Sequence, residues 1–270
     1  MQPKPTIIIW DLGNVLFAPS KFRLASYIGF LNCILYIILE WKNPAKLRTK
    51  FFDILNATRA QEPRYPYMPA DELGTPMPNI MADYQAGIIT SQQLLQEVFH
   101  TIQKRDRHNY FSSKRERLIL EKTMQAIFDP TIFVYINKPI IQAIDLLAQC
   151  HQNMLTKTWS IQAMMILSNL EAETFELMQQ STEDQSILQY FEPHNIFISG
   201  FFHNRKMLKP SPEIFSYLLA QRDLNPESYI FIDDQDVNIK TARACGMHAI
   251  HLQNGDYQQV EMELKRLLSE

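Results

Sequence analysis

The chain has 270 residues, of which 46% are apolar and 20% are charged. These values are typical of a soluble globular protein with room for one large domain or for a domain with an insertion. A net charge of −3 argues against bulk electrostatic binding to nucleic acid, so we expect no nucleic-acid partner. The three cysteines, Cys33, Cys150 and Cys245, form neither a disulfide framework nor a zinc pattern. We therefore expect a reducing compartment, the cytoplasm.

The N-terminal stretch 6–17 (TIIIWDLGNVLF) begins as a continuous apolar run. Such a run of β-branched residues predicts a strand that is buried on both faces of a parallel sheet. The strand should end at Asp11, which also keeps the run too short for a signal peptide. In open α/β sheets ligands bind beyond the carboxyl ends of the strands, so Asp11 is a candidate functional residue. The alternative is that Asp11 and Gly13 only form a turn.

Residues 18–135 are predicted to be helices and loops without a convincing strand. The segment 24–39 (LASYIGFLNCILYIIL) is strongly apolar but shorter than the roughly 18 or more residues of a membrane-spanning helix. We therefore predict no transmembrane segment and a helix that is buried nearly all round. A helix that contacts a membrane or a partner protein through 24–39 is the alternative. The expected helices cover 21–40, 44–56, a segment that begins after Thr90, and Lys114–Phe128.

Two features subdivide this helical part. Five prolines in 57–79 exclude a regular helix or a central strand, which indicates an ordered loop or lid, with a plain surface loop as the alternative. Thr90 and Gln93 have the spacing of a capping box at the start of a helix. The apolar residues that follow at helical spacing are Leu94, Leu95, Val98, Phe99 and Ile102.

Beyond residue 135 the pattern alternates between helices and short apolar strands. Pro139 is expected to begin a helix, as is Pro212 after Ser211, whereas Gly246 should follow a helix end and Asp256 should cap the last helix together with Gln259. The alternation, with one strand far away at the N-terminus, predicts a doubly wound parallel α/β sheet interrupted by a helical insertion. We expect a core of 1–17 and 136–270 and an inserted unit of 18–135. The predicted strands are 163–167, 195–199, 229–233 and 248–252.

Polar side chains follow three of the predicted strands, and parallel strands place such residues at one edge of the sheet. A carboxylate there can attack phosphorus, and a second carboxylate can bind Mg²⁺ through its oxygens. A serine hydroxyl and a lysine ammonium can hold phosphate oxygens. Taken one at a time, these residues have ordinary alternatives as a helix cap, a surface lysine or a loop. The residues are Asp11, Ser168 with Asn169, and Asp233 with Asp234, joined by Lys209 from a loop.

Taken together, these residues resemble the four motifs of the haloacid dehalogenase-like (HAD) hydrolases. The motifs are DLGNV at 11–15, LSN at 167–169, KP at 209–210 and FIDD at 231–234. The resemblance covers the N-terminal strand and about 138–254. The DLGNV variant is most similar to the sugar-phosphatase branch, which includes bacterial glucose-1-phosphate phosphatases. In that branch YQAGIIT at 84–90 has a counterpart, a glycine turn that opens a cap helix.

The resemblance implies a Mg²⁺-dependent phosphomonoester hydrolase for a small phosphorylated metabolite, possibly a sugar phosphate. Asp11 would be the nucleophile that forms an aspartyl-phosphate. Mg²⁺ would be held by the Asp11 side chain, the Gly13 carbonyl and Asp233, with Asp234 in support. The insertion 18–135 would be the family's cap domain, which closes over the site and selects the substrate. The implied phosphate-binding residues are Leu12, Asn14, Ser168, Asn169 and Lys209.

The sequence departs from the family pattern at Gly13. Most phosphatases of the family have an aspartate there as general acid and base, a contribution of roughly 10²–10⁴-fold to the rate. The DLGNV branch shares the glycine. The insertion is also longer than in simple sugar phosphatases, and its apolar helix and proline-rich stretch have no counterpart that we can assign.

Three alternatives follow from these departures. One is a HAD-fold binding or regulatory protein that is catalytically weak or inactive. The second is a haloacid dehalogenase, which needs no metal and so leaves Asp233 and Asp234 unexplained. A phosphate-transferring mutase is the third, although it would be expected to keep the acid-base residue that Gly13 replaces. The sequence predicts no particular oligomeric state.

Overall fold

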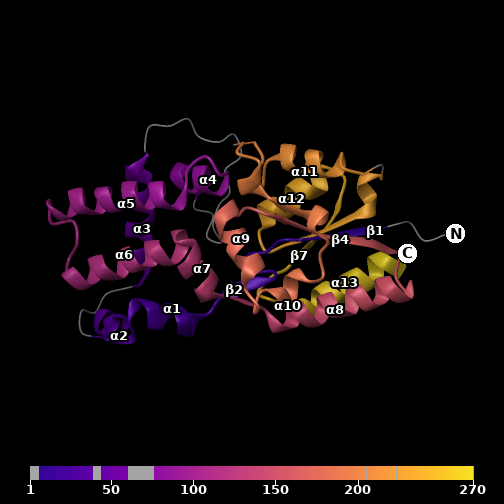
Figure 1. Cartoon of the computed structure of the whole chain (residues 1–270), viewed down its shortest axis with the longest axis horizontal. Coiled ribbons are helices and arrows are strands. Elements are labelled where there is room, and N and C mark those ends of the chain that lie inside the picture. Colours follow the sequence, from indigo (N-terminus) through magenta and orange to yellow (C-terminus); the bar gives the residue numbers. More distant parts are fainter. Residues whose placement is uncertain (1–5, 39–43, 60–75, 205, 223, 270) are drawn as a thin grey trace.

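The protein is described here by a computed structural model that covers residues 6–38, 44–59, 76–204, 206–222 and 224–269. Figure 1 shows an elongated molecule, with a sheet and its covering helices on the right and helices α1–α7 on the left. The proline-rich segment 57–79 therefore lies mostly outside the described residues, and its prediction as a loop or lid stays a prediction. No described helix is long and apolar enough to cross a membrane.

The centre of the molecule is a five-stranded parallel sheet with the order β5-β4-β1-β6-β7. β1 is the middle strand: its Trp10 is level with Ile166 on one side and with Ile232 on the other. The predicted pairing of 163–167 beside the N-terminal strand and the predicted fold class are therefore confirmed. The strands are β1 (Thr6–Trp10), β4 (Ile161–Ser168), β5 (Ile196–Ile198), β6 (Tyr229–Asp233) and β7 (His248–His251).

The central position of β1 explains why its sequence is apolar throughout. Side chains alternate between the two faces of a strand, and both faces of this sheet are covered. Ile8 and Trp10 belong to a core on one face, and Ile7 and Ile9 belong to a second core on the other. The covering helices are α8 (Ile141–Thr156), α9 (Ala172–Gln180), α10 (Gln185–Leu188), α11 (Pro212–Leu219), α12 (Asp236–Ala244) and α13 (Tyr257–Ser269).

The prediction that Pro139 begins a helix is wrong. Pro139 ends the short strand β3 (Asn137–Pro139), which pairs antiparallel with β2 (Phe17–Pro19). Proline is compatible with such a ribbon because it stands at the strand's end, where a missing N–H group breaks no ladder. Helix α8 starts two residues later, at Ile141. The ribbon joins the two points at which the chain leaves and re-enters the region of the sheet. Because β2 extends to Pro19, the prediction that 18–135 contains no strand is wrong at its first residues.

The described residues between 20 and 136 form mostly helices, with a hydrophobic core of their own that includes Ile54, Leu94, Val98 and Met124. The predicted capping box is present, since Gln93 N donates to Thr90 Oγ1 at 3.2 Å and the Gln93 side chain accepts from Thr90 N at 3.0 Å. The helices are α1 (Lys21–Ile28), α2 (Phe30–Ile38), α3 (Pro44–Thr58), α4 (Asn79–Gln85), α5 (Ser91–Asp106), α6 (Lys114–Phe128) and α7 (Pro130–Ile136).

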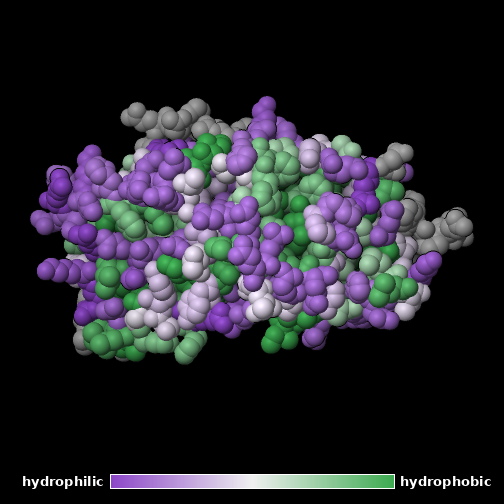
Figure 2. All heavy atoms as spheres, in the orientation of Figure 1, coloured by the Kyte–Doolittle hydropathy of each residue, from purple (hydrophilic) through white to green (hydrophobic). Residues whose placement is uncertain are grey.

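The prediction of one buried helix over 21–40 is also wrong. Gly29, at φ +99°, breaks it into α1 and α2, because glycine adopts positive φ without the steric penalty of a side chain. The exposed fraction is 67% for Leu31 and 49% for Ile34. Figure 2 shows the resulting apolar patch at the lower left, over α2. The helix lies at the end of the molecule, where Tyr36 is buried against Ile119 but the opposite side has no neighbouring element among the described residues.

The turn after α4 touches the region of the sheet directly. Ser199 Oγ donates to Gln85 O at 2.6 Å, and His203 Nδ1 lies 2.8 Å from Gly87 O. A Cβ atom on Gly87 would lie 2.3 Å from Gly200 O, far inside van der Waals contact. Gly87 therefore permits a close backbone approach between the helical part and the sheet part.

We expect Gly87→Ala to destabilise the protein more than Gly255→Ala. The two glycines have nearly the same φ, +68° and +69°, but a Cβ on Gly255 meets nothing within 4 Å. Both variants should lose about 1 kcal/mol to positive-φ strain, and Gly87→Ala should lose about 1–3 kcal/mol more to overpacking. The free energy of unfolding in urea measures this. Equal losses in both variants would show that the close approach to Gly200 does not matter.

Candidate active site

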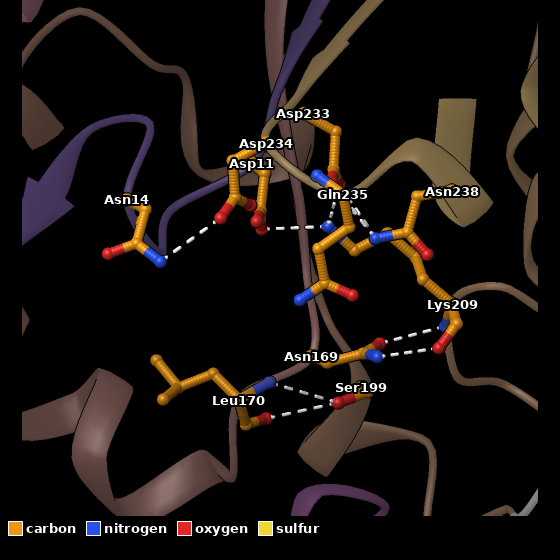
Figure 3. A network of polar contacts seen from close by, with 10 residues as sticks. All are labelled: Asp11, Asn14, Asn169, Leu170, Ser199, Lys209, Asp233, Asp234, Gln235 and Asn238. Atoms are coloured by element: carbon orange, nitrogen blue, oxygen red, sulfur yellow. Dashed lines mark hydrogen bonds and ion pairs between the residues drawn. The ribbon is translucent and has the colours of Figure 1, made fainter. Parts of the chain in front are cut away.

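The carboxyl edge of the sheet brings the motif residues together (Figure 3). Asp11 directly follows β1, Ser168 ends β4 and Asp233 ends β6, and these three strands are neighbours. Asp11 N donates to Ile232 O at 3.0 Å, which continues the ladder of β1 and β6 by one residue. These residues are far apart in the chain but form a compact cluster, because their strands are parallel and in register.

Lys209 lies at the centre of this cluster. Its side chain is 2% exposed, and its Nζ atom lies 2.8 Å from Asp11 Oδ1 and 2.7 Å from Asp233 Oδ2. Asn169 fixes the loop that carries it, because Asn169 Oδ1 accepts from Lys209 N at 2.8 Å and Asn169 Nδ2 donates to Lys209 O at 2.7 Å. The Asn169 amide is therefore engaged with the main chain of the lysine loop.

Asp233 is fully buried and held by several donors. Asn238 Nδ2 lies 3.0 Å from each carboxylate oxygen, and Gln235 N donates to Oδ1 at 2.8 Å. Sequence reasoning missed Asn238. Its only signal in the sequence is its position, five residues after Asp233 and in the first turn of α12.

The cluster carries more negative charge than its lysine offsets. Burial, together with the charges of Asp11 and Asp233, raises the pKa of Asp234 to about 7. Burial raises the pKa of Asp233 as well. Burial alone would lower the pKa of Lys209, but the two facing carboxylates hold that pKa above its usual value. The ammonium therefore stays protonated while the carboxylates repel one another.

Three of these carboxylates can hold a metal ion. Ligand oxygens of Asp11, Asp233 and Asp234 lie within 4.8 Å of one another. Mg²⁺ prefers such hard oxygen ligands, and a cation there would offset the charge that raises the pKa of Asp234. Asn14 Nδ2 donates to Asp234 Oδ2 at 3.0 Å and orients it. Gly13 lies in the same turn, between Asp11 and Asn14. The donor set thus fits Mg²⁺.

A cavity of about 220 Å³ lies over the cluster, between the edge of the sheet and the inserted helices α4, α6 and α7. Glu171 lines it, a residue that sequence reasoning did not single out. Its carboxylate caps α9 by accepting from Thr174 N at 2.5 Å and from Glu173 N at 2.7 Å, and burial raises its pKa. All of the predicted site residues except Asp233 line the same cavity: Asp11, Leu12, Gly13, Asn14, Ser168, Asn169, Lys209 and Asp234.

Comparison with known proteins gives one family match and several similar structures. Residues 207–267 match the model of a HAD-hydrolase-like family. A HAD family enzyme from Bacteroides thetaiotaomicron is similar over 96% of this chain and 98% of its own, with a TM-score of 0.53 and 18% identity. That enzyme has also been solved in complex with magnesium and inorganic phosphate, with a TM-score of 0.50 and 17% identity over 93% and 96% of the two chains.

Two further solved structures are similar to this chain over nearly its whole length. A predicted HAD-like family hydrolase from Porphyromonas gingivalis has a TM-score of 0.52 at 16% identity, over 98% of each chain. The putative HAD-hydrolase YfnB from Bacillus subtilis has a TM-score of 0.53 at 13% identity, over 97% of this chain and 99% of its own. These findings confirm the predicted resemblance to the HAD-like hydrolases: the chain has their fold, and its segment 207–267 matches their family model.

Proposed function

We propose that the protein is a Mg²⁺-dependent phosphatase that hydrolyses a small phosphate monoester through an aspartyl-phosphate on Asp11. The observation that carries the proposal is the buried Lys209, placed between Asp11 and Asp233 at the base of a cavity. The magnesium and phosphate bound by the similar Bacteroides enzyme support it. The sugar-phosphatase branch that the DLGNV motif resembles gives a sugar phosphate as one candidate substrate.

Each residue has a distinct task in this proposal. An Asp11 oxygen attacks phosphorus, the bond from phosphorus to the leaving oxygen breaks, and water later hydrolyses the acyl-phosphate. The Lys209 ammonium and the Ser168 hydroxyl donate to the phosphoryl oxygens, with help from the amides of Leu12 to Asn14. Asn169 holds Lys209 in place.

Mg²⁺, when bound, would offset the charge of the phosphate oxygens. Asp11, the Gly13 carbonyl and Asp233 would hold it, with Asp234 in support. Asn238 would keep the Asp233 carboxylate oriented, because both of its oxygens are within hydrogen-bond distance of the Asn238 amide nitrogen.

We further propose that 18–135 acts as a cap domain over a core of 1–17 and 136–270. The separate hydrophobic core of the inserted helices supports this division. The cavity supports it too, because Met81, Tyr84 and Phe128 form one wall and the motif residues form the other. Closing such a cap excludes water and positions the substrate.

Because position 13 is a glycine, no obvious residue donates the proton that the leaving group needs. A Cβ atom at Gly13 would meet nothing within 4 Å, and no positive φ constrains the position, so the backbone there accepts a side chain. Glu171 is one candidate donor from the cavity wall, since burial raises its pKa. A non-catalytic binding protein is the second candidate function, and Gly13 favours it. A scaffold, however, would gain nothing from a buried lysine between two carboxylates, which is costly to desolvate.

A panel of phosphate esters with and without Mg²⁺ tests the proposal. Phosphate release should require Mg²⁺, and Asp233→Asn should lower kcat/KM by about 100-fold or more, because it removes a carboxylate ligand of the metal and even residues that only orient such ligands are worth about 10–100-fold. Asp184→Asn is the matched control because Asp184 is a buried aspartate outside the cavity. It should retain wild-type kcat/KM. Mg²⁺-dependent turnover that survives Asp233→Asn would contradict the metal assignment.

Gly13→Asp tests the role of the missing acid. If the acid is simply absent, the added carboxyl should speed hydrolysis of alkyl and sugar phosphates, whose alcohols leave only with a proton, by about 10²-fold. p-Nitrophenyl phosphate should gain little, because its leaving group needs no proton. Steady-state kcat values on both ester types measure this. Equal slowing on both would reject the account and favour a donor from the cavity wall, such as Glu171.

A further inference from the structure

The cavity has two chemically different ends. The end at the sheet carries the charged and hydrogen-bonding residues already described. The opposite end is formed by the inserted helices, by the start of β2, by α9 and by the residues just before α4 and α9, and it is mostly apolar. The apolar lining residues there are Phe17, Met77, Met81, Ile127, Phe128, Phe133, Leu170 and Met178.

The polar side chains on the apolar end are largely occupied by the protein itself. The Tyr84 hydroxyl donates to Phe128 O at 3.4 Å, and Asn137 Nδ2 donates to Phe133 O at 2.9 Å. The Glu171 carboxylate accepts two main-chain amides of α9. Groups engaged in this way have fewer donors and acceptors left to replace the water of an incoming ligand, so this wall offers few hydrogen bonds to a substrate.

One acceptor on this wall is buried without a partner, and two more acceptors of the same kind, Gln235 Oε1 and Asn238 Oδ1, belong to residues that line the cavity beside the aspartates. Gln85 Oε1 is buried and, among the described residues, has no hydrogen-bond partner. Gln85 lines the cavity from the last turn of α4, and its main-chain carbonyl is held by Ser199. A buried acceptor without a partner is costly, so a ligand that donates one hydrogen bond here would be favoured.

We propose, on the basis of the phosphatase function above, that the substrate is a phosphate monoester of an apolar alcohol, alkyl or aromatic, with at most one donor group that reaches Gln85. A sugar phosphate would bring several hydroxyls to a wall on which, among the described residues, Gln85 Oε1 is the one buried acceptor without a partner. Each hydroxyl that loses its water without a new partner reduces affinity by about tenfold. An apolar chain of the same size gains about fourfold for each methylene that it buries.

A series of n-alkyl phosphates from propyl to hexyl tests the inference in the Mg²⁺-loaded protein. The alcohols of this series have nearly the same acidity, so only the buried apolar area changes. kcat/KM should rise about fourfold per methylene, as expected for apolar burial, and hexyl phosphate should exceed glucose 6-phosphate. Rates that do not depend on chain length, with glucose 6-phosphate as the better substrate, would overturn the inference and leave the phosphatase function intact.

Met81→Gln and Met262→Gln are the matched pair of variants. The two substitutions make the same chemical change, but Met81 lines the cavity and Met262 is 64% exposed on α13. Met81→Gln should lower the hexyl-to-propyl ratio of kcat/KM by about tenfold, because a polar amide replaces apolar contact. Met262→Gln should keep the wild-type ratio. An unchanged ratio in Met81→Gln would contradict the assignment of this wall.

Binding of n-alkylphosphonates, measured by calorimetry, separates the two claims. These compounds carry a phosphorus–carbon bond and are not hydrolysed. If no ester of the panel is turned over, the phosphatase function fails, and the phosphonates still decide the inference. Dissociation constants that fall about fourfold per methylene would support an apolar ligand. Constants that do not depend on chain length would overturn it.

Discussion

The buried contact of Lys209 with Asp11 and Asp233 is the interaction on which the site depends. It joins three segments that are far apart in the chain, and it forms only if β1 and β6 are neighbours and the lysine loop lies over their ends. Breaking a buried ion pair by removing one partner costs about 3–5 kcal/mol. Proteins seldom bury such groups without a use for them, and here the cluster faces a cavity.

The sequence predicted the sheet and most of the cluster because strands and turns carry local signals. A continuous apolar run ended by a polar residue gave the edge position of Asp11, and the same pattern gave Asp233. Asn238 and Glu171 were missed because a polar residue within or before a helix looks the same whether it faces solvent or a buried carboxylate. The break at Gly29 and the ribbon at Pro139 depend on packing between distant segments, which local propensity does not encode.

The shape of the cavity is the part of the site that is hardest to predict from the sequence. Neither Met81 nor Phe133 was singled out from the sequence, and the packing of the inserted helices over the sheet places both in the cavity that Asp11 lines. The motifs alone favoured a sugar phosphate, whereas this wall favours an apolar alcohol. In our proposals, catalytic chemistry thus depends on strand ends in the sheet, and substrate choice depends on the insertion. The close approach of Gly87 to Gly200 is one of the contacts through which these two parts meet.

The central claim is that Asp11 becomes phosphorylated. The direct measurement is to mix the Mg²⁺-loaded protein with a hydrolysable ester, quench with acid, reduce with borohydride and sequence the peptides by mass spectrometry. Borohydride reduces an acyl-phosphate to an alcohol, so an aspartyl-phosphate leaves homoserine in its place. Our account predicts homoserine at position 11 in the wild-type protein. Phosphate release with Asp11 unmodified, or with the mark at Asp234, would contradict it.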